Sequence, residues 1–386
     1  MQLLTPSTQA YAWGSRTLIQ ELRGQQPGGS PIAELWYGAH PAGPSQVAGE
    51  SLVDLIAENP DVLGENVRET YGDRLPFLLK LLAADLPLSL QAHPSKAQAE
   101  EGFARDNAAG LELTAGNRNY RDDNHKPELI VALSEFHAMA GFRPLAQTRE
   151  LFEVLDCPEL DRYLSLTVAD PEFEEANLRA LFTTWITIPA QARIELIDAV
   201  IAAANKTIPN AKPWMAQALR NIVELNEHYP HDIGVLGALL LNYVVLQPGQ
   251  ALFLGAGNLH AYVRGLGVEI MANSDNVLRG GLTAKHINVP ELVRVLRFSP
   301  LADVIVDPEG THYPVPVPDF AIERVEIADA ITRDLGQRPG IALCTAGELK
   351  VGDVEIAPAQ AVWIPAHEGP WQVSGTGELF IATVGA

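Results

Sequence analysis

A change of pattern along the chain constrains the fold more than any other feature of the sequence. Up to about Arg143, Gly and Pro turns separate short apolar runs such as Leu75–Leu82 and Leu129–Leu133, a pattern typical of strands with short helices between them. From about Pro144 to Asn226, leucine, isoleucine and valine recur at helical spacing with few glycines. This stretch predicts an all-helical segment inserted between two β regions.

The β pattern returns from Asn242 onwards. Two apolar runs within 243–254 flank a turn at Pro248 and Gly249, which predicts a hairpin. Near the C-terminus, Gly, Pro and Asp separate further short strands, predicted over 340–345, 347–354, 360–365 and 378–384. Many short strands with regular turns favour a sandwich or barrel, of which the jelly roll is a common form. We therefore expect a mainly β fold of two β units with an α-helical insertion.

The charge of the chain restricts its partners. Its 386 residues include 27 Lys and Arg against 48 Asp and Glu, a net charge of −21. Such a charge repels nucleic acids and anionic membrane surfaces, and we expect neither as a partner. An anionic small-molecule substrate would need a local cluster of Lys and Arg to reverse the potential at its site.

Cysteine usage and hydropathy predict the compartment. Cys157 and Cys344 lie far apart, so the sequence offers neither a disulfide framework nor a cysteine-based zinc motif. The N-terminus lacks the basic flank and apolar run of a secretory signal. The longest apolar run, Gly234–Leu246, is too short to span a bilayer. These features predict a cytoplasmic protein. A monomer is the expected oligomeric state.

Three separate segments carry side chains that could bind a metal ion. Gln91 and His93 are two residues apart in an alternating stretch, so a strand there would project both from one face. Lys126 and Glu128 have the same spacing, and His260 follows a glycine-rich turn. Two imidazoles, a carboxylate and an amide oxygen are plausible zinc ligands, but two histidines and a carboxylate also describe a non-haem iron site. Each segment alone is more typical of an ordinary polar pair.

A family resemblance joins these segments. In order and spacing, the chain resembles the type I mannose-6-phosphate isomerases over Ala33–Pro41, Pro87–Pro94, Asn124–Glu128, Gly257–Tyr262 and Gly267–His286. The resemblance implies one zinc ion per chain, held by Gln91, His93, Glu128 and His260, and interconversion of mannose 6-phosphate and fructose 6-phosphate through an enediol or enediolate. It also implies two cupin-type jelly-roll units: a catalytic domain in two parts, 1–143 and 233–320, a helical domain at 144–232 inserted in it, and a C-terminal unit at 321–386.

The resemblance also implies roles for residues around the metal. An aldose-ketose isomerase moves a proton between adjacent carbons, and either Glu269 or Lys126 would shuttle it. Arg279, beside Gly280 and Gly281, would stabilise the enediolate or the phosphate, because arginine stays charged and matches phosphate geometry. Lys285 would add a second cation. Further positions that match the family pattern and would line the substrate pocket are Trp13, Glu34, Lys80, Ser89, Tyr262 and Asp275.

Two other functions fit parts of this pattern. A cupin-type iron oxygenase would use two histidines and one carboxylate, although Gln91 as a fourth ligand and the Arg and Lys positions argue against it. A sugar-phosphate-binding sensor without catalysis would retain the fold and the cations. We expect the isomerase.

Overall fold

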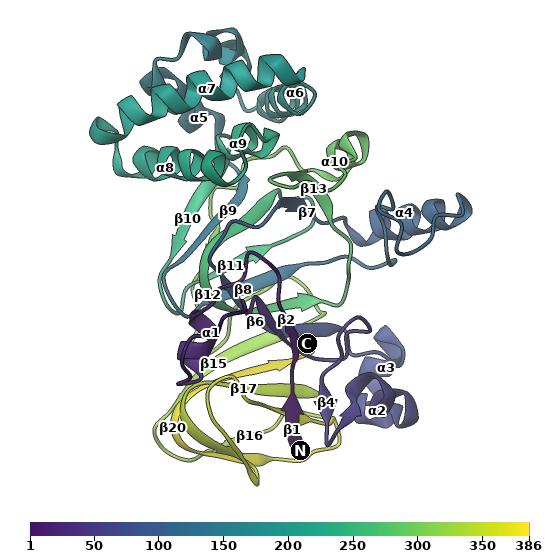
Figure 1. Cartoon of the computed structure of the whole chain (residues 1–386). Coiled ribbons are helices and arrows are strands. Elements are labelled where there is room, and N and C mark those ends of the chain that lie inside the picture. The colour runs from purple at the N-terminus through teal and green to yellow at the C-terminus, as the bar shows by residue number, and fades with distance from the viewer. Residues whose placement is uncertain (386) are drawn as a thin grey trace.

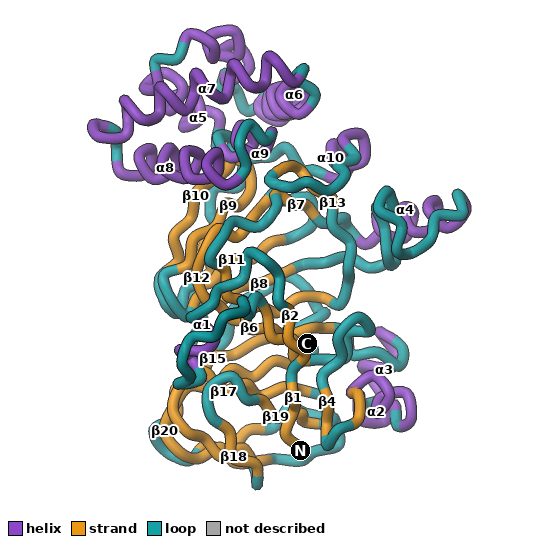
Figure 2. The backbone as a smooth tube through the Cα atoms, in the orientation of Figure 1, coloured by secondary structure: helices purple, strands orange, loops and turns teal. Residues whose placement is uncertain are grey.

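The computed structural model describes residues 1–385 and arranges them in three layers, which Figure 1 shows from end to end. A group of helices lies at one end, a large antiparallel sheet lies in the middle, and a second antiparallel sheet lies at the other end beside the N-terminus. Figure 2 shows the same division by secondary structure, with one group of helices above the two sheets and further helices beside them. The predicted fold class, two antiparallel β units with an α-helical insertion, is confirmed.

The middle sheet contains eleven of the described strands and carries three of the candidate metal ligands, while the fourth, His93, directly follows its strand β7. Its strands are β2 (Ser7–Gln9), β3 (Glu34–Tyr37), β6 (Phe77–Ala84), β7 (Leu90–Ala92), β8 (Glu128–Ala132), β9 (Phe136–Phe142), β10 (Leu241–Leu246), β11 (Ala251–Leu254), β12 (His260–Ala272), β13 (Leu278–Gly281) and β14 (Ile305–Val306). The long strand β12 pairs with β6 and β8 over its second half and with β7 and β9 over its first half. It therefore joins the two faces of a jelly-roll-like unit.

The second sheet contains nine of the described strands and includes segments from both ends of the chain. They are β1 (Gln2–Thr5), β4 (Gln46–Val47), β5 (Glu50–Ser51), β15 (Ala321–Ile327), β16 (Ile331–Arg333), β17 (Gly340–Val351), β18 (Val354–Ile356), β19 (Ala361–Ile364) and β20 (Trp371–Thr383). β1 lies between β19 and β4, with Leu3 opposite Val362. The N-terminus thus contributes a strand to the C-terminal unit. Ala386, the last residue of that predicted unit, lies outside the described residues.

Strand alternation explains how the middle sheet can be buried on one side and polar on the other. In β6, Leu79 and Leu81 belong to the hydrophobic core that includes Phe380 of the second sheet, whereas Lys80 between them faces the opposite way. Val268 and Ile270 of β12 flank Glu269 in the same manner. Successive side chains of a strand point to opposite faces, so one face packs on the second sheet and the other presents charged groups to the site.

Helices cover the rest of the middle sheet and the flanks of both sheets. Their bounds are α1 (Leu18–Leu22), α2 (Leu52–Glu58), α3 (Glu65–Tyr71), α4 (Lys96–Ala108), α5 (Leu145–Leu155), α6 (Glu174–Ile186), α7 (Ala190–Thr207), α8 (Pro213–His228), α9 (Ile233–Ala238) and α10 (Val289–Val295), with 3-10 turns at Pro60–Leu63, Pro158–Thr167 and Ile208–Asn210. In α8, Pro213 occupies the first turn, and Met215, Leu219, Ile222 and Leu225 form one buried stripe. This stripe shares a core with Leu90 and Ala261, so the insertion stands directly on the strands that carry Gln91 and His260. No helix within residues 1–385 has the length and apolar character needed to cross a bilayer.

Two local predictions were wrong. The runs around Pro248 and Gly249 form strands β10 and β11, but β10 pairs with β9 whereas β11 pairs with β8 and β14. The Pro-Gly turn therefore sends the chain from one face of the unit, where β10 pairs with β9, to the other, where β11 pairs with β8. The predicted strands 340–345 and 347–354 are largely one strand, β17, whose pairing with β20 shifts register between Cys344 and Ala346.

Candidate metal centre and active site

Three buried side chains meet at one point of the middle sheet. The donor atoms of His93, Glu128 and His260 lie within 4.8 Å of one another. Glu128 Oε2 is 3.4 Å from His93 Nε2 and 3.3 Å from His260 Nε2. These three atoms are buried and have no hydrogen-bond partner within residues 1–385. Because buried polar atoms are almost always partnered, the three residues form a metal site, and their nitrogen and oxygen donors suit a divalent cation.

The hydrogen bonds at Nδ1 of His93 and His260 determine the tautomer of each ring. His93 Nδ1 lies 2.7 Å from the carbonyl oxygen of Asn276, and His260 Nδ1 lies 2.9 Å from that of Asn258. A carbonyl oxygen only accepts, so each Nδ1 carries the proton and each Nε2 presents a lone pair to the shared point. Burial lowers the pKa of His93 to about 4, which keeps its ring neutral, as a ligand must be.

Sheet register brings Gln91 and Arg279 to the same face as His260. Gln91 of β7 is the direct partner of His260 on β12 and of Arg279 on β13. Directly opposed residues of antiparallel strands project to one side of the sheet. Gln91 is therefore suited to be a fourth ligand, and Arg279 extends the row at its edge.

Lys126 lies beside the metal site. Its Nζ is 2.8 Å from Glu128 Oε1, the carboxylate oxygen that does not face the histidines. Burial alone would raise the pKa of Glu128, but the ammonium of Lys126 outweighs it and holds that pKa well below its usual value. Glu128 is thus ionised and ready to bind a cation. His125 turns the other way, and its Nε2 lies 3.0 Å from Asp319.

A second group of buried charges lies next to the metal site. Lys80 Nζ is 2.9 Å from Glu269 Oε2 and 3.6 Å from Glu34 Oε1, and Tyr262 donates its hydroxyl to Glu269 Oε1 at 2.9 Å. Burial lowers the pKa of Lys80, but the two carboxylates outweigh it and raise that pKa above its usual value. Burial also raises the pKa of Glu269, against the opposing effect of Lys80. The pKa of Tyr262 is raised well above 10 by burial and by Glu269, so Tyr262 remains a donor.

An irregularity in β12 allows this group and the metal ligands to share one interior. His260 and Tyr262 precede Glu269 by nine and seven positions, both odd offsets, so a regular strand would place Glu269 on the opposite face. The pairing of β12 with β9 shifts register between Tyr262 and Arg264, and such a bulge inverts the alternation. Gly265 follows at φ +125° with Phe136 packed against it, where a Cβ would lie 2.8 Å from the carbonyl oxygen of Glu135. The strand thereby bends and turns Glu269 inward.

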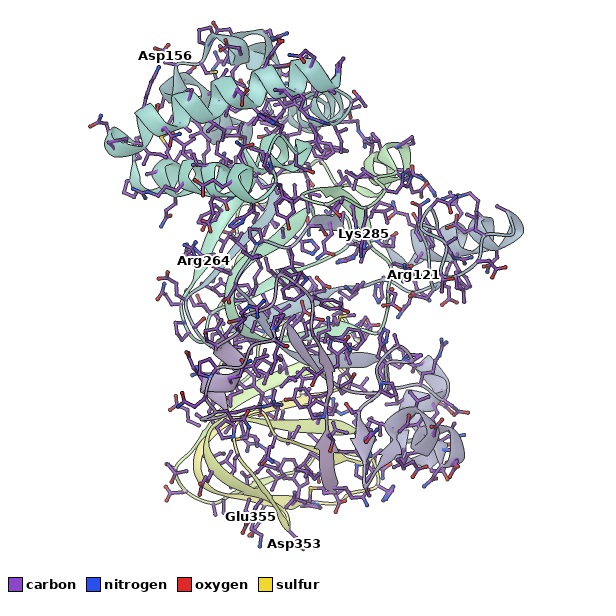
Figure 3. The ribbon with its side chains drawn as sticks, in the orientation of Figure 1. Arg121, Asp156, Arg264, Lys285, Asp353 and Glu355 are labelled. Atoms are coloured by element: carbon purple, nitrogen blue, oxygen red, sulfur yellow. The ribbon has the colours of Figure 1, made fainter. Side chains whose placement is uncertain are left out.

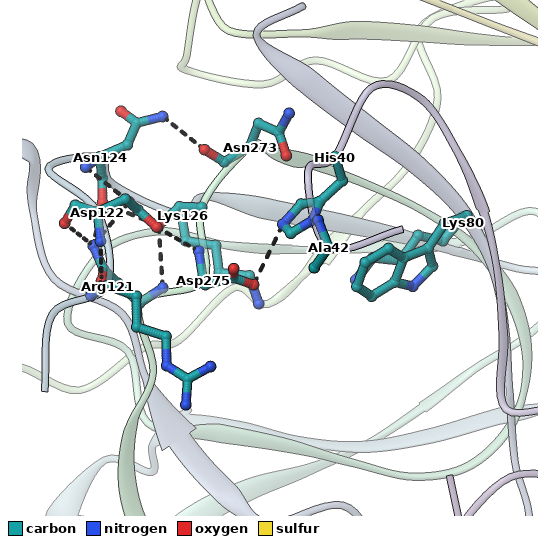
Figure 4. A network of polar contacts seen from close by, with 12 residues as sticks. His40, Ala42, Lys80, Arg121, Asp122, Asn124, Lys126, Asn273 and Asp275 are labelled. Carbon is teal, nitrogen blue, oxygen red and sulfur yellow. Dashed lines mark hydrogen bonds and ion pairs between the residues drawn. The ribbon is translucent and has the colours of Figure 1, made fainter. Parts of the chain in front are cut away.

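Residues at the edge of the site include two that the sequence did not single out. Asp275 Oδ1 lies 3.3 Å from Nε2 of the buried His40 (Figure 4), and His40 Nδ1 accepts a hydrogen bond from the backbone of Ala42 at 3.1 Å. Trp13 stacks on Tyr11 with ring centroids 5.6 Å apart. His40 lies in the Ala33–Pro41 segment that carries the family resemblance, which could have indicated it, whereas Tyr11 lies in an irregular segment that no motif marks. Ser89 is half-buried, one residue before β7.

Three cations gather on the side of the site nearest α10 and α4. Figure 3 shows Lys285 and Arg121 near one another there. The pKa of Lys285 is lowered by Arg279, by burial and by Arg121, and burial and Arg121 lower the pKa of Arg279. Like charges that act on each other in this way form a positive patch in an otherwise acidic protein. Arg121 was missed because its segment carries no motif of its own in the sequence.

Known proteins are similar to this chain in sequence and in fold. A family model described as phosphomannose isomerase type I, catalytic domain, matches residues 1–145. The mannose-6-phosphate isomerase of Escherichia coli (strain K12) is 39% identical over 98% of each chain, and that of Homo sapiens is 33% identical over 85% of this chain and 82% of its own.

Solved structures agree with the sequence comparison. The apo form of mannose 6-phosphate isomerase from Salmonella typhimurium superposes with a TM-score of 0.90 at 36% identity, covering 100% of this chain and 99% of that one. A zinc-bound mannose 6-phosphate isomerase gives 0.89 at 37% identity with the same coverage. The chain belongs to the type I mannose-6-phosphate isomerase family.

Proposed function

We propose that this chain is a zinc-dependent isomerase that interconverts D-mannose 6-phosphate and D-fructose 6-phosphate. One observation carries the proposal: the orphaned Nε2, Oε2 and Nε2 atoms of His93, Glu128 and His260 converge beside a cluster of cations. The proteins similar to it over almost their whole length are mannose-6-phosphate isomerases.

In this proposal one zinc ion per chain is held by Gln91, His93, Glu128 and His260. Support for Gln91 comes from its register with His260, and an amide oxygen completes a set that catalytic zinc accepts. Two imidazoles, an amide and one carboxylate leave a divalent ion with roughly one net positive charge. Bound there, zinc would supply a Lewis acid for the substrate oxygens at C1 and C2.

We assign the proton transfer between C2 and C1 to Glu269. The raised pKa of Glu269 lies closer to a neutral working pH than that of an ordinary carboxyl group, and a general base works best when its pKa is near the working pH. Lys80 and Tyr262 hold its two oxygens from different strands, so its orientation is fixed. Lys126, the alternative, lies against Glu128 and is better suited to donate a hydrogen bond to a substrate oxygen as negative charge develops in an enediolate.

The positive patch of Arg121, Arg279 and Lys285 would bind the phosphate group. Arg121 lowers the pKa of Arg279, and both arginines lower the pKa of Lys285, so a dianion placed among the three cations would replace this repulsion by charge-assisted hydrogen bonds. Trp13, stacked on Tyr11, offers an aromatic face for the sugar carbons. Asp275 and Ser89 would contact its hydroxyl groups.

A coupled assay tests the proposed activity. Purified protein should convert mannose 6-phosphate to fructose 6-phosphate under anaerobic conditions, and a chelator should abolish the conversion until zinc is restored. Turnover that needs iron and oxygen would identify the oxygenase chemistry that two histidines and a carboxylate also permit. Binding of the sugar phosphate without turnover in zinc-loaded protein would indicate a sensor.

The predicted organisation and location remain proposals. We propose catalytic domain parts at 1–143 and 233–320, a helical domain at 144–232 and a C-terminal unit at 321–386. The helices α5 to α8 lie within 145–228, which supports the insertion. We also propose a monomer in the cytoplasm, where the buried free thiols of Cys157 and Cys344 would stay reduced.

A further inference from the structure

The carboxylate of Asp122 joins two loops beside the metal site, and Figure 4 shows this network from close by. It accepts four hydrogen bonds. Its Oδ1 receives the hydroxyl of Ser274 at 2.7 Å, the backbone N–H of Asn124 at 2.9 Å and the side-chain amide of Asn276 at 3.1 Å, and its Oδ2 receives the backbone N–H of Asp275 at 2.7 Å. All of these groups are donors, so the carboxylate ties segment 121–124 to segment 273–276.

Asn276 carries the connection onward. Its side chain is fully buried and donates to the carbonyl oxygens of Asp122 at 2.8 Å and Asn124 at 2.9 Å. Its Oδ1 accepts the backbone N–H of Arg121 at 2.7 Å. Its own carbonyl oxygen accepts Nδ1–H of His93 at 2.7 Å. One residue therefore orients a metal ligand and fixes the backbone of a phosphate-patch cation.

We infer that Asp122 is a positioning residue, which sets the geometry of the metal site and the phosphate patch together. The inference rests on the proposed function for its catalytic consequences. Through Asn276 it orients His93, through the same residue it holds Arg121, and through the backbone of Asp275 it presents that carboxylate to His40. Groups that orient ligand histidines tune metal affinity even though they do not touch the metal.

The chemistry of the network requires a carboxylate at this position. Asparagine at 122 could keep one oxygen for Ser274 and Asn124, but its NH2 would then face the backbone N–H of Asp275, donor against donor. Alanine would leave all four donors without this acceptor. The two variants should therefore differ in degree, with asparagine between the wild-type protein and alanine.

The test compares Asp122→Ala and Asp122→Asn with Asp123→Asn, which removes the same charge from the adjacent, exposed residue. Zinc affinity of metal-free protein is measured by chelator competition, and kcat and KM for mannose 6-phosphate are measured at saturating zinc. We expect zinc binding to weaken roughly 10- to 100-fold in Asp122→Ala, less in Asp122→Asn, and not in Asp123→Asn. KM should rise in the same order, because Arg121 is displaced.

Wild-type zinc affinity and KM in a folded Asp122→Ala protein would overturn the inference, as would equal effects in Asp122→Ala and Asp123→Asn. If Asp122→Ala does not fold, Asp122→Asn and Ser274→Ala decide the question by the same readouts. A wild-type protein without isomerase activity would defeat the proposed function alone, because the order of zinc affinities is still measurable.

Discussion

Replacing Lys80 by methionine tests the buried charge group next to the metal site. Lys80 lies 2.9 Å from Glu269 and 3.6 Å from Glu34, and all three side chains are at most 8% exposed. At an effective dielectric constant of about 20, each contact is worth roughly 4–6 kcal/mol before desolvation is subtracted. Methionine fills most of the volume but leaves two buried carboxylates facing each other. Removing one partner of a buried ion pair typically lowers the free energy of unfolding by about 3–5 kcal/mol, and we expect Lys80→Met to lower it by this amount.

The effect should depend on pH in a defined direction. Without Lys80, burial and mutual repulsion raise the pKa of one carboxylate above the value of about 4.3 that Glu has in the unfolded chain. A carboxyl group with a raised folded pKa stabilises the fold below its unfolded pKa and loses that contribution as pH rises. The destabilisation of Lys80→Met relative to the wild-type protein should therefore be larger at pH 8 than at pH 5.

Denaturant unfolding of zinc-loaded proteins at both pH values measures this prediction. Lys350→Met is the matched control, since Lys350 pairs with Asp353 at 3.8 Å on the surface and should change stability by less than about 0.5 kcal/mol. Adding Glu269→Gln to Lys80→Met should restore a large part of the loss, because one buried charge is removed. A Lys80→Met effect no larger than that of Lys350→Met, or strictly additive single effects, would refute the reasoning.

Three shorter predictions concern chemistry and acid stability. Arg279→Ala should raise KM for mannose 6-phosphate roughly 10- to 100-fold, the value of a charge-assisted hydrogen bond, with unchanged zinc content by elemental analysis; an unchanged KM contradicts its role. Tyr262→Phe should lower kcat about 10-fold, because Glu269 loses an orienting donor, and equal kcat would show that the hydroxyl is dispensable. Burial would raise the pKa of Glu291, but hydrogen bonds from Tyr120 and Arg105 outweigh burial and hold that pKa below its usual value. The Glu291 carboxylate therefore stabilises the fold above about pH 4.3, and this contribution is lost as the pH falls. Glu291→Gln should therefore make the melting temperature depend less on pH below pH 5, and the same pH dependence as in the wild-type protein would contradict this.

Much of the candidate site followed from the sequence because strand alternation is a local property. The spacing of Lys126 and Glu128 predicted a shared face, and the structure places their charged atoms 2.8 Å apart. By the same alternation His125, which precedes Lys126, is expected to point away from both, and its Nε2 contacts Asp319. The convergence of Glu128 and His260 could not be derived in this way, because it depends on pairing between strands far apart in the chain.

Long-range pairing also accounts for what the sequence did not reveal of the fold. Leu3 lies opposite Val362, and nothing near the N-terminus indicates that its strand belongs to the C-terminal sheet. The Pro-Gly turn predicted a hairpin, yet the strands on either side pair with β9 and β8, which lie far away in the sequence. Glu269 faces inward only because β12 has a bulge after Tyr262, and a single residue of irregularity leaves no clear trace in an apolar pattern.

Zinc titration of metal-free protein during mannose 6-phosphate turnover tests the proposed centre at Gln91, His93, Glu128 and His260. The protein is stripped with a chelator, and activity is followed as zinc is added to the wild-type chain and to His260→Ala. We predict no activity without metal, full recovery at one zinc ion per chain, and no recovery in His260→Ala. Full activity of the metal-free protein, or recovery of His260→Ala at the same zinc concentration as the wild type, would contradict the proposed metal centre.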